Sequence, residues 1–324
     1  MNNGNLAVKM TMLCNSNCKN CTSRMKKYKL SEKNYMDFDL FCELVNEAHD
    51  YGINHVTFSG GEPTLVPTLT DYIDYATSKG MTTRVMTNGL KLTPDYISEL
   101  YQSGLKQLCL SLYSTDYQDY TELRNNKRMH EKALQAAKNM SLFSDKMTLI
   151  MQTIICRVNY SGIPRLLDFA IDNHFHYLWT SLLEDAINLP QIRMTRDNIE
   201  VFNNITIPAI KERSSRLLEK DRDFFLQSAD RLFHYPEYAD GIYHDKDFSH
   251  CHLLGNLFIA FPDGKIGYCS GYDYFSDTEE EFTKGFFNHL NIDKQIEIMH
   301  KFCKYCPHGK HVSLQLREAK YKPF

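Results

Sequence analysis

Three closely spaced cysteines near the start of the chain are its most chemically informative residues. They read Cys14-Asn-Ser-Asn-Cys18-Lys-Asn-Cys21, a C-x3-C-x2-C spacing. Three thiolates on one short loop can bind three irons of a [4Fe–4S] cubane and leave the fourth iron open to an amino acid's nitrogen and carboxylate oxygen. A structural zinc site needs four ligands, and no fourth Cys or His follows soon after Cys21. Taken alone, the spacing favours a cluster over zinc or coincidence.

A second group of four cysteines lies in the last quarter of the chain: Cys251, Cys269, Cys303 and Cys306. The first two flank a predicted β-hairpin, in which residues 258–261 and 266–269 are joined by a Pro-Asp-Gly-Lys turn. The last two form a C-x2-C motif after a short predicted helix. Four thiolates suit a fully ligated [4Fe–4S] cluster and a four-cysteine zinc site about equally well.

Glycines and polar residues follow the predicted strands near the first cysteine group. Gly60-Gly61-Glu62-Pro63 comes after the second strand, Thr87-Asn88-Gly89 after the third, and Ser111 lies in the fourth. The two glycines let the backbone approach a ligand closely, and Glu62 can accept a hydrogen bond from an ammonium group. Alone, the glycine segment more often marks a turn at the end of a strand.

An alternation of strands and helices must position these residues. The predicted strands are Leu6–Leu13, Ile53–Ser59, Thr82–Thr87, Gln107–Ser114, Thr148–Cys156 and His176–Leu183. The amphipathic helices between them are predicted over Asp37–Tyr51, Thr68–Lys79, Pro94–Ser103, His130–Phe143 and Ile163–Asn173. This order indicates βαβ units around a parallel sheet. Because chemistry in such sheets lies at the carboxyl ends of the strands, the first cysteine loop is expected at the mouth of a barrel.

Length and composition limit the remaining possibilities. The 324 residues allow roughly two units, and we predict a barrel over 1–190, a helical connector over 191–241 and a second unit over 242–324. With 37 basic and 40 acidic residues, the formal charge is −3, so we expect no nucleic-acid partner. The sequence has neither an apolar run of about 18 residues nor a signal peptide, so we expect a cytoplasmic protein with no membrane partner.

Together, the cysteine loop, the Gly60-Gly61-Glu62-Pro63 segment, Thr87-Asn88-Gly89 and Ser111 resemble the radical S-adenosylmethionine (SAM) superfamily in type and order. The resemblance implies an α/β fold with a partial (β/α)6 TIM-like barrel, and a [4Fe–4S] cluster whose open iron binds SAM. It also implies that Glu62 and the glycine backbone meet the SAM amino group. Asn88 and Ser111 would help to hold its ribose or carboxylate, with Arg124 a further candidate for the carboxylate. One departure is Asn20, where many members have an aromatic residue near the adenine.

Beside such a barrel, the second cysteine group resembles the auxiliary-cluster tails called twitch or SPASM domains. The resemblance implies a small α+β domain with a β-hairpin that holds an auxiliary [4Fe–4S] cluster through Cys251, Cys269, Cys303 and Cys306. It further implies a 5′-deoxyadenosyl radical that abstracts hydrogen from a peptide or a small polar natural-product precursor of the aminocyclitol or sugar type. A fully ligated cluster favours net oxidation of the substrate, and the chemistry requires an electron donor such as flavodoxin or ferredoxin.

Two alternatives remain open from the sequence. Cys156 ends the fifth predicted strand, and an inward thiol there could return a hydrogen atom to the substrate radical, which would make the protein an epimerase. A packed strand cysteine is the commoner role for such a residue. The second alternative is a zinc-stabilised, non-catalytic binding protein that has the barrel without the chemistry.

Overall fold

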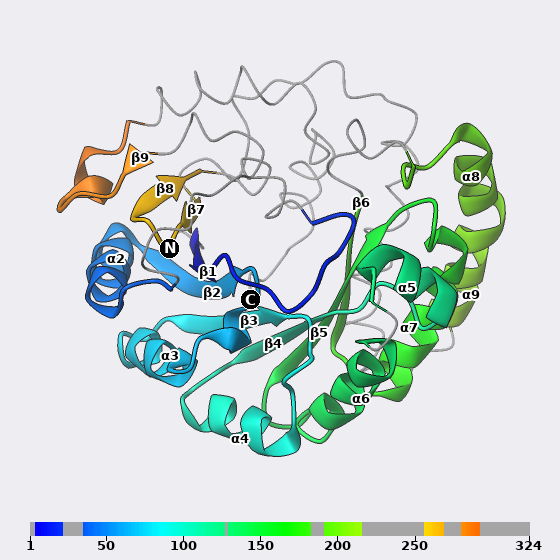
Figure 1. Cartoon of the computed structure of the whole chain (residues 1–324), viewed down its shortest axis with the longest axis horizontal. Helices are drawn as coiled ribbons and strands as arrows, with labels where there is room; N and C mark the ends of the chain where they lie inside the picture. The colour runs from blue at the N-terminus through cyan, green and yellow to red at the C-terminus, as the bar shows by residue number, and fades with distance from the viewer. Residues whose placement is uncertain are drawn as a thin grey trace.

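A curved, mainly parallel sheet organises the chain in the computed structural model, which describes residues 4–21, 35–126, 129–182, 191–215, 256–268 and 280–291. The strands run in the order β6-β5-β4-β3-β2-β1-β7-β8-β9 (Figure 1). All pairs from β6 to β7 are parallel, and the last two pairs are antiparallel. The strands are β1 (Gly4–Thr11), β2 (Ile53–Gly60), β3 (Thr82–Thr87), β4 (Gln107–Ser111), β5 (Thr148–Ile155), β6 (Tyr177–Leu182), β7 (Leu257–Ala260), β8 (Lys265–Gly267) and β9 (Glu280–Glu281).

Helices cover the outer, convex side of this sheet, as Figure 1 shows. They are α2 (Phe38–Tyr51), α3 (Leu69–Ser78), α4 (Pro94–Gln102), α5 (Tyr117–Arg124), α6 (Met129–Ser141), α7 (Ile163–Asp172), α8 (Arg196–Val201) and α9 (Ile207–Ser215). A π-helical turn, η3 (Phe202–Thr206), joins α8 to α9. Short 3-10 turns are η1 (Pro63–Leu65), η2 (Tyr160–Gly162) and η7 (Phe286–His289). The repeated strand-helix order makes this a partial α/β barrel, as the sequence predicts.

Local signals in the sequence explain where the helices begin and end. The Asp37 carboxylate caps α2 by accepting from the backbone N–H groups of Asp39 and Leu40 at 3.1 and 3.2 Å. At the other end Gly52 has a φ of 102°, a left-handed conformation that favours glycine. Asp116 caps α5 in the same way as Asp37 caps α2.

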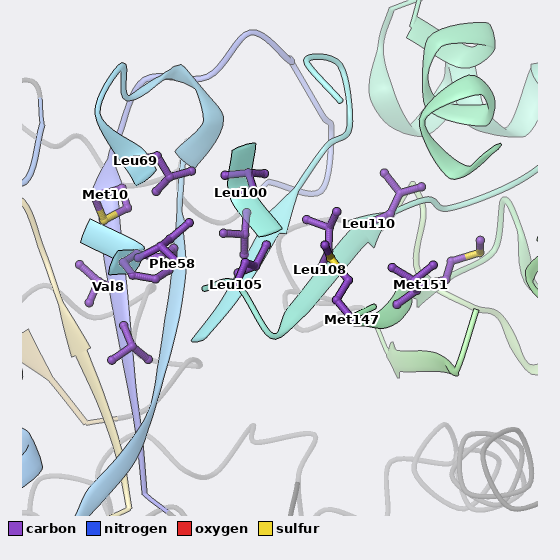
Figure 2. Packing of buried hydrophobic residues seen from close by; sticks show 14 of the residues in the cluster. Val8, Met10, Phe58, Leu69, Leu100, Leu105, Leu108, Leu110, Met147 and Met151 are labelled. Atoms are coloured by element: carbon purple, nitrogen blue, oxygen red, sulfur yellow. The ribbon is translucent and has the colours of Figure 1, made fainter. Parts of the chain in front are cut away.

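The main core lies between the sheet and its helices. Every second residue of β1 points into it, namely Leu6, Val8 and Met10, each with no exposed surface. Figure 2 shows Val8 and Met10 beside Phe58 of β2, with Leu108 and Leu110 of β4 further along the same layer. The alternation leaves the other residues of each strand for the concave side of the sheet.

The observed elements match the predicted ones closely, with ends that differ by three residues at most. The sequence missed α5, which lies between β4 and α6 and carries the candidate Arg124 at its last position. The predicted hairpin is present as β7 and β8, but β7 also pairs in parallel with β1, from Asn5 with Leu257 to Val8 with Ala260. The hairpin therefore extends the barrel's own sheet.

Several sequence predictions fall outside the described residues. These include the second cysteine group, Cys251, Cys269, Cys303 and Cys306, and the short helix expected before the last two. The domain limits at 190 and 241 stay predictions. In the described part of the chain, no helix is long and apolar enough to span a bilayer.

Candidate active site at the carboxyl ends of the strands

The first cysteine loop leaves β1 at the carboxyl edge of the sheet, where the sequence analysis expected it. Cys14 is exposed, and Cys18 and Cys21 are half-buried. A backbone hydrogen bond of 2.9 Å from Lys19 N to the Leu123 carbonyl ties the loop to the end of α5. All three thiols therefore lie on one loop above the strand ends.

Polar hydrogens already point at two of the three sulfurs. The Cys18 Sγ atom lies 3.1 Å from the Arg124 Nη1 atom and 3.1 Å from the Ser16 hydroxyl. The Cys14 Sγ atom accepts a 3.4 Å contact from the Ser16 backbone N–H. Such contacts to cluster sulfurs influence the reduction potential of a bound cluster.

The pKa of Cys14 is raised to about 11. Although one side of this residue meets solvent, enough protein surrounds the sulfur that desolvation is the main cause, and the Ser16 N–H opposes it. The negative charge of Glu62 raises the pKa further. Metal binding by this thiol must therefore release a proton, because the thiolate is the ligand.

A single metal ion and a cubane make different demands on the three cysteines. Among the described Cys, His, Asp and Glu residues, no three side chains converge closely enough to hold a single metal ion. A zinc ion with bonds of about 2.3 Å requires that convergence. A cubane makes a different demand, since each cysteine binds its own iron. The three-cysteine loop supplies one thiol for each of three irons.

Gly60 and Gly61 support the cysteine loop directly. Gly61 N donates to the Thr11 carbonyl at 2.6 Å, and Glu62 N donates to the Leu13 carbonyl at 2.8 Å. A Cβ atom on either glycine would collide with these same backbone segments. The two glycines therefore permit the backbone to approach the chain's own cysteine loop closely. The sequence analysis expected a close approach to a ligand instead.

Glu62 is a buried carboxylate, only 1 % exposed. Its Oε1 atom accepts from the Thr64 and Thr87 hydroxyls at 2.7 and 2.6 Å, and its Oε2 atom accepts from Asn88 N at 2.8 Å. Desolvation raises its pKa, and these hydrogen bonds only partly oppose the rise. Among the described residues, no cation forms an ion pair with this carboxylate.

Asn88 and Ser111 lie at the ends of the neighbouring strands. The Asn88 Nδ2 atom donates to Asn15 Oδ1 at 2.7 Å and lies 3.9 Å from the Cys14 sulfur. Ser111 is half-buried, and its carbonyl accepts from the Arg124 guanidinium. Asn88 thus contacts the cysteine loop, whereas Ser111 lies next to Arg124.

Arg124 is held among polar and aromatic groups at the end of α5. Its guanidinium carbon lies 4.1 Å from the ring centroid of Tyr113, and its Nε atom is buried without a hydrogen-bond partner in the described part of the chain. Burial alone would lower its pKa, but the nearby sulfur and phenol groups outweigh burial, so the pKa lies above its usual value. The side chain stays charged and faces Cys18.

Asn20 occupies the position before the third cysteine. It is 5 % exposed, and its Oδ1 atom is buried with no hydrogen-bond partner among the described residues. Its side chain faces the Tyr113 hydroxyl. Asn20 therefore supplies a hydrogen-bond acceptor at the position where an aromatic residue would supply the flat face of a ring.

Cys156 follows β5 and is 1 % exposed. Its side chain packs with Leu123 and Ile192 in a small apolar cluster, and burial raises its pKa to about 11. These contacts are those of a packed strand cysteine, and they leave the thiol little access to the space beside the cysteine loop.

The sequence analysis missed two asparagines that organise this region. Asn15 accepts from Asn88, as described above. Asn159 is fully buried, and its Nδ2 atom donates to the carbonyls of Tyr113 and Ile154 at 2.7 and 2.8 Å, which ties the ends of β4 and β5 together. A buried asparagine of this kind has no periodic signal, because its partners are backbone atoms of other strands.

Fold and site together define a partial α/β barrel with a three-cysteine loop and a buried carboxylate at its mouth. A family model described as the Radical SAM superfamily matches residues 8–170, half of the chain. The chain therefore belongs to the radical SAM superfamily. Membership implies SAM and a [4Fe–4S] cluster as cofactors, and the buried Glu62 and the open thiol loop fit them.

Curated relatives match the chain over shorter stretches. An S-adenosylmethionine-dependent nucleotide dehydratase of Flammeovirga pacifica is 36 % identical over 103 residues, which cover 31 % of this chain and 35 % of that protein. The PqqA peptide cyclase of Granulibacter bethesdensis is 24 % identical over 217 residues, 64 % of this chain and 55 % of that protein. The matches thus span about a third to about a half of these relatives.

Solved structures are similar over nearly the whole chain. Streptococcus suis SuiB bound to precursor peptide SuiA has a TM-score of 0.69 at 19 % identity, covering 98 % of this chain and 73 % of SuiB. Native anSMEcpe with bound AdoMet and Kp18Cys peptide has a TM-score of 0.65 at 13 % identity, covering 94 % and 88 %. At these identities the likeness establishes the fold.

Proposed function

We propose that the chain is a radical SAM oxidoreductase that binds a [4Fe–4S] cluster through Cys14, Cys18 and Cys21. The observation that carries the proposal is the placement of this loop against the buried Glu62 at the carboxyl ends of the strands. When bound, the cluster and SAM together supply a 5′-deoxyadenosyl radical that removes hydrogen from a C–H bond of the substrate.

The chain's own residues would bind and orient these groups. The Glu62 carboxylate would accept hydrogen bonds from the SAM ammonium group, because it is buried and has a lightly used Oε2 atom. Gly60 and Gly61 would keep the cysteine loop close to that carboxylate. Asn88, Ser111 and Arg124 would contact the ribose or carboxylate of SAM.

A peptide is the substrate that we propose. The support is that SuiB and anSMEcpe, which share the fold over nearly all of this chain, have been solved with bound peptides. The local 36 % identity to a nucleotide dehydratase supports a small phosphorylated metabolite as the second candidate. An electron donor of the flavodoxin or ferredoxin type belongs to either proposal.

Net oxidation is the proposed outcome. Cys251, Cys269, Cys303 and Cys306 would hold an auxiliary [4Fe–4S] cluster in a twitch- or SPASM-like tail over 242–324, after the barrel over 1–190 and a connector over 191–241. An epimerase that uses Cys156 is less favoured, because that thiol packs against Leu123 and Ile192.

Anaerobic reconstitution tests the proposal. We expect iron and sulfide to bind, and dithionite to produce 5′-deoxyadenosine and methionine from SAM. Cys18→Ala should abolish this cleavage, whereas the matched control Cys42→Ala, a half-buried cysteine on α2, should retain it. Equal cleavage by both variants would reject the assignment of Cys18 as a cluster ligand. Zinc in place of iron, with no cleavage of SAM, would reject the proposal and favour a non-catalytic binding protein.

A further inference from the structure

The six barrel strands carry an unusual distribution of charge. From β1 to β6 they contain no Asp or Glu, and their charged residues are Lys9 and Arg84. Both are half-buried. They occupy the alternate positions that the helix-side core leaves free, since Val8 and Val85 beside them are core residues. On the concave side, the six described strands therefore contribute two cations and no carboxylate.

Contacts across the sheet fix the direction of Arg84. Its Nε atom donates to the Gln107 Oε1 atom at 2.6 Å, and its guanidinium carbon lies 4.4 Å from the ring centroid of Trp179. Trp179 belongs to β6, and two strands separate β6 from β3. At about 4.8 Å per strand, that is about 14 Å along the sheet, so the contact can form only across the concave side.

Arg84 lies deeper than the proposed SAM site. It stands three residues before Thr87, the end of β3, which corresponds to about 10 Å at 3.3 Å per residue. Lys9 stands two residues before the end of β1 and is thus nearer the cysteine loop. Glu62 and Asn88 both lie beyond the strand ends, so these two cations form a separate level below them.

A planar guanidinium that is held at Nε and stacked on a ring is well suited to recognise oxyanions. Arginine binds carboxylate and phosphate groups through two parallel hydrogen bonds, and a partly enclosed site strengthens the attraction. We infer that the concave face binds the substrate through a carboxylate or phosphate group that Arg84 and Lys9 recognise. This inference rests on the proposed function for a substrate in that space.

Trp179 makes the inference directly measurable, because it is the single tryptophan of the chain. The holoenzyme with SAM is titrated with three probes: an acetylated, amidated peptide with two glutamates, its glutamine counterpart, and inorganic pyrophosphate. We expect a saturable change in tryptophan emission with the glutamate peptide, with pyrophosphate, or with both, and none with the glutamine peptide. A response to one probe alone identifies that carboxylate or phosphate source.

Substitutions assign the response to the two cations. Arg84→Gln and Lys9→Gln should each weaken binding by about tenfold or more, as expected for a charge-assisted hydrogen bond. Arg84→Lys, which keeps the charge but not the paired hydrogen bonds, should give an intermediate loss. The matched control Arg196→Gln, an exposed arginine on α8, should bind as the parent protein does.

Three results would overturn the inference: no saturable response to either anion, an equal response to the glutamine peptide, or unchanged affinity in the folded Arg84 and Lys9 variants. Circular dichroism and iron content verify folding, and Arg84→Lys serves as the test if Arg84→Gln does not fold. SAM cleavage in the same preparation separates the two proposals. Anion binding without cleavage rejects the proposed function alone, and cleavage without anion binding rejects this inference alone.

Discussion

Arg124 connects several parts of the site through one side chain. Its guanidinium contacts the Cys18 sulfur, the Ser111 carbonyl and the Tyr113 ring. Hydrogen bonds and positive charge near a cluster sulfur stabilise the reduced cluster, because reduction adds negative charge. Arg124 can therefore influence the reduction potential of the cluster as well as the binding of SAM.

We predict that Arg124→Gln lowers the midpoint potential of the cluster and that Arg124→Lys lowers it less. The physical reason is the loss of the charge and of the 3.1 Å contact to the Cys18 sulfur. A redox titration followed by electron paramagnetic resonance measures this without turnover. Arg165→Gln, an exposed arginine on α7, is the control and should leave the potential unchanged. An unchanged potential in the Arg124 variants would contradict the expectation.

A pH dependence of SAM affinity is expected from Glu62. Burial raises the pKa of this carboxyl in the folded chain, so the unliganded protein loses stability as pH rises from the usual glutamate range through the raised pKa. The ionised form binds the SAM ammonium group, so affinity should increase over the same pH window. Titration calorimetry at several pH values measures the change.

Glu62→Gln should weaken SAM binding about tenfold to a hundredfold and should remove the pH dependence, because the variant has no carboxylate to ionise. Glu99→Gln, an exposed glutamate on α4, is the matched control. A pH dependence that persisted in Glu62→Gln would assign it to another group.

At the scale of elements, the strands and most helices followed from periodicity and end signals. Asp37 before an amphipathic run and Gly52 after it predicted α2 almost to the residue. The helix α5 was missed because few of its residues are apolar and buried, chiefly Tyr120 and Leu123. Its position could have been suspected from Asp116, an N-cap residue type.

The tertiary contacts of the site were less accessible to sequence reasoning. Glu62 was identified by its motif, but its four hydrogen-bond donors come from two different turns and required the fold. The pairing of β7 with β1 joins segments about 250 residues apart, and no local pattern encodes it. The role of the buried Asn159 could not be predicted either, because its hydrogen-bond partners are backbone atoms of other segments.

The turn after β2 has no room for a side chain at Gly61. Gly61→Ala should disrupt the hydrogen bonds to Thr11 and Leu13, because the new Cβ atom would collide with rigid backbone. We expect loss of iron binding together with destabilisation of about 1–3 kcal/mol. Iron content and denaturant unfolding provide the measurements.

Gly162→Ala is the matched control for this prediction. Gly162 has a helical backbone, and a Cβ atom there would meet its nearest neighbour, the flexible Arg165 side chain, at 3.4 Å. The variant should bind iron normally and change stability by no more than about 1 kcal/mol. Normal iron binding by Gly61→Ala would show that the cysteine loop does not depend on this close contact.

At the scale of the molecule, the barrel and the described part of the tail share one sheet and one core. Phe258 of β7 is fully buried, and its ring centroid lies 4.9 Å from that of Phe287 and 5.9 Å from that of Tyr51 at the end of α2. The aromatic cluster of Tyr51, Phe258 and Phe287 thus spans the proposed limit between the barrel and the tail.

This cluster predicts that the barrel and the hairpin unfold together. Phe258→Ala should remove about 3–5 kcal/mol of stability, because it leaves a cavity in a shared core. Trp179 in β6 reports on the barrel from its far edge, so its emission should follow the same denaturant transition as circular dichroism and should shift with it. Leu142→Ala, which alters a residue that is 63 % exposed, should change stability by about 0.5 kcal/mol at most. The opposite result would be an unchanged denaturant midpoint for Trp179 emission, with part of the circular dichroism signal lost at a lower denaturant concentration. The tail would then be a separate folding unit, and the parallel pairing of β1 with β7 would contribute little to the stability of the barrel.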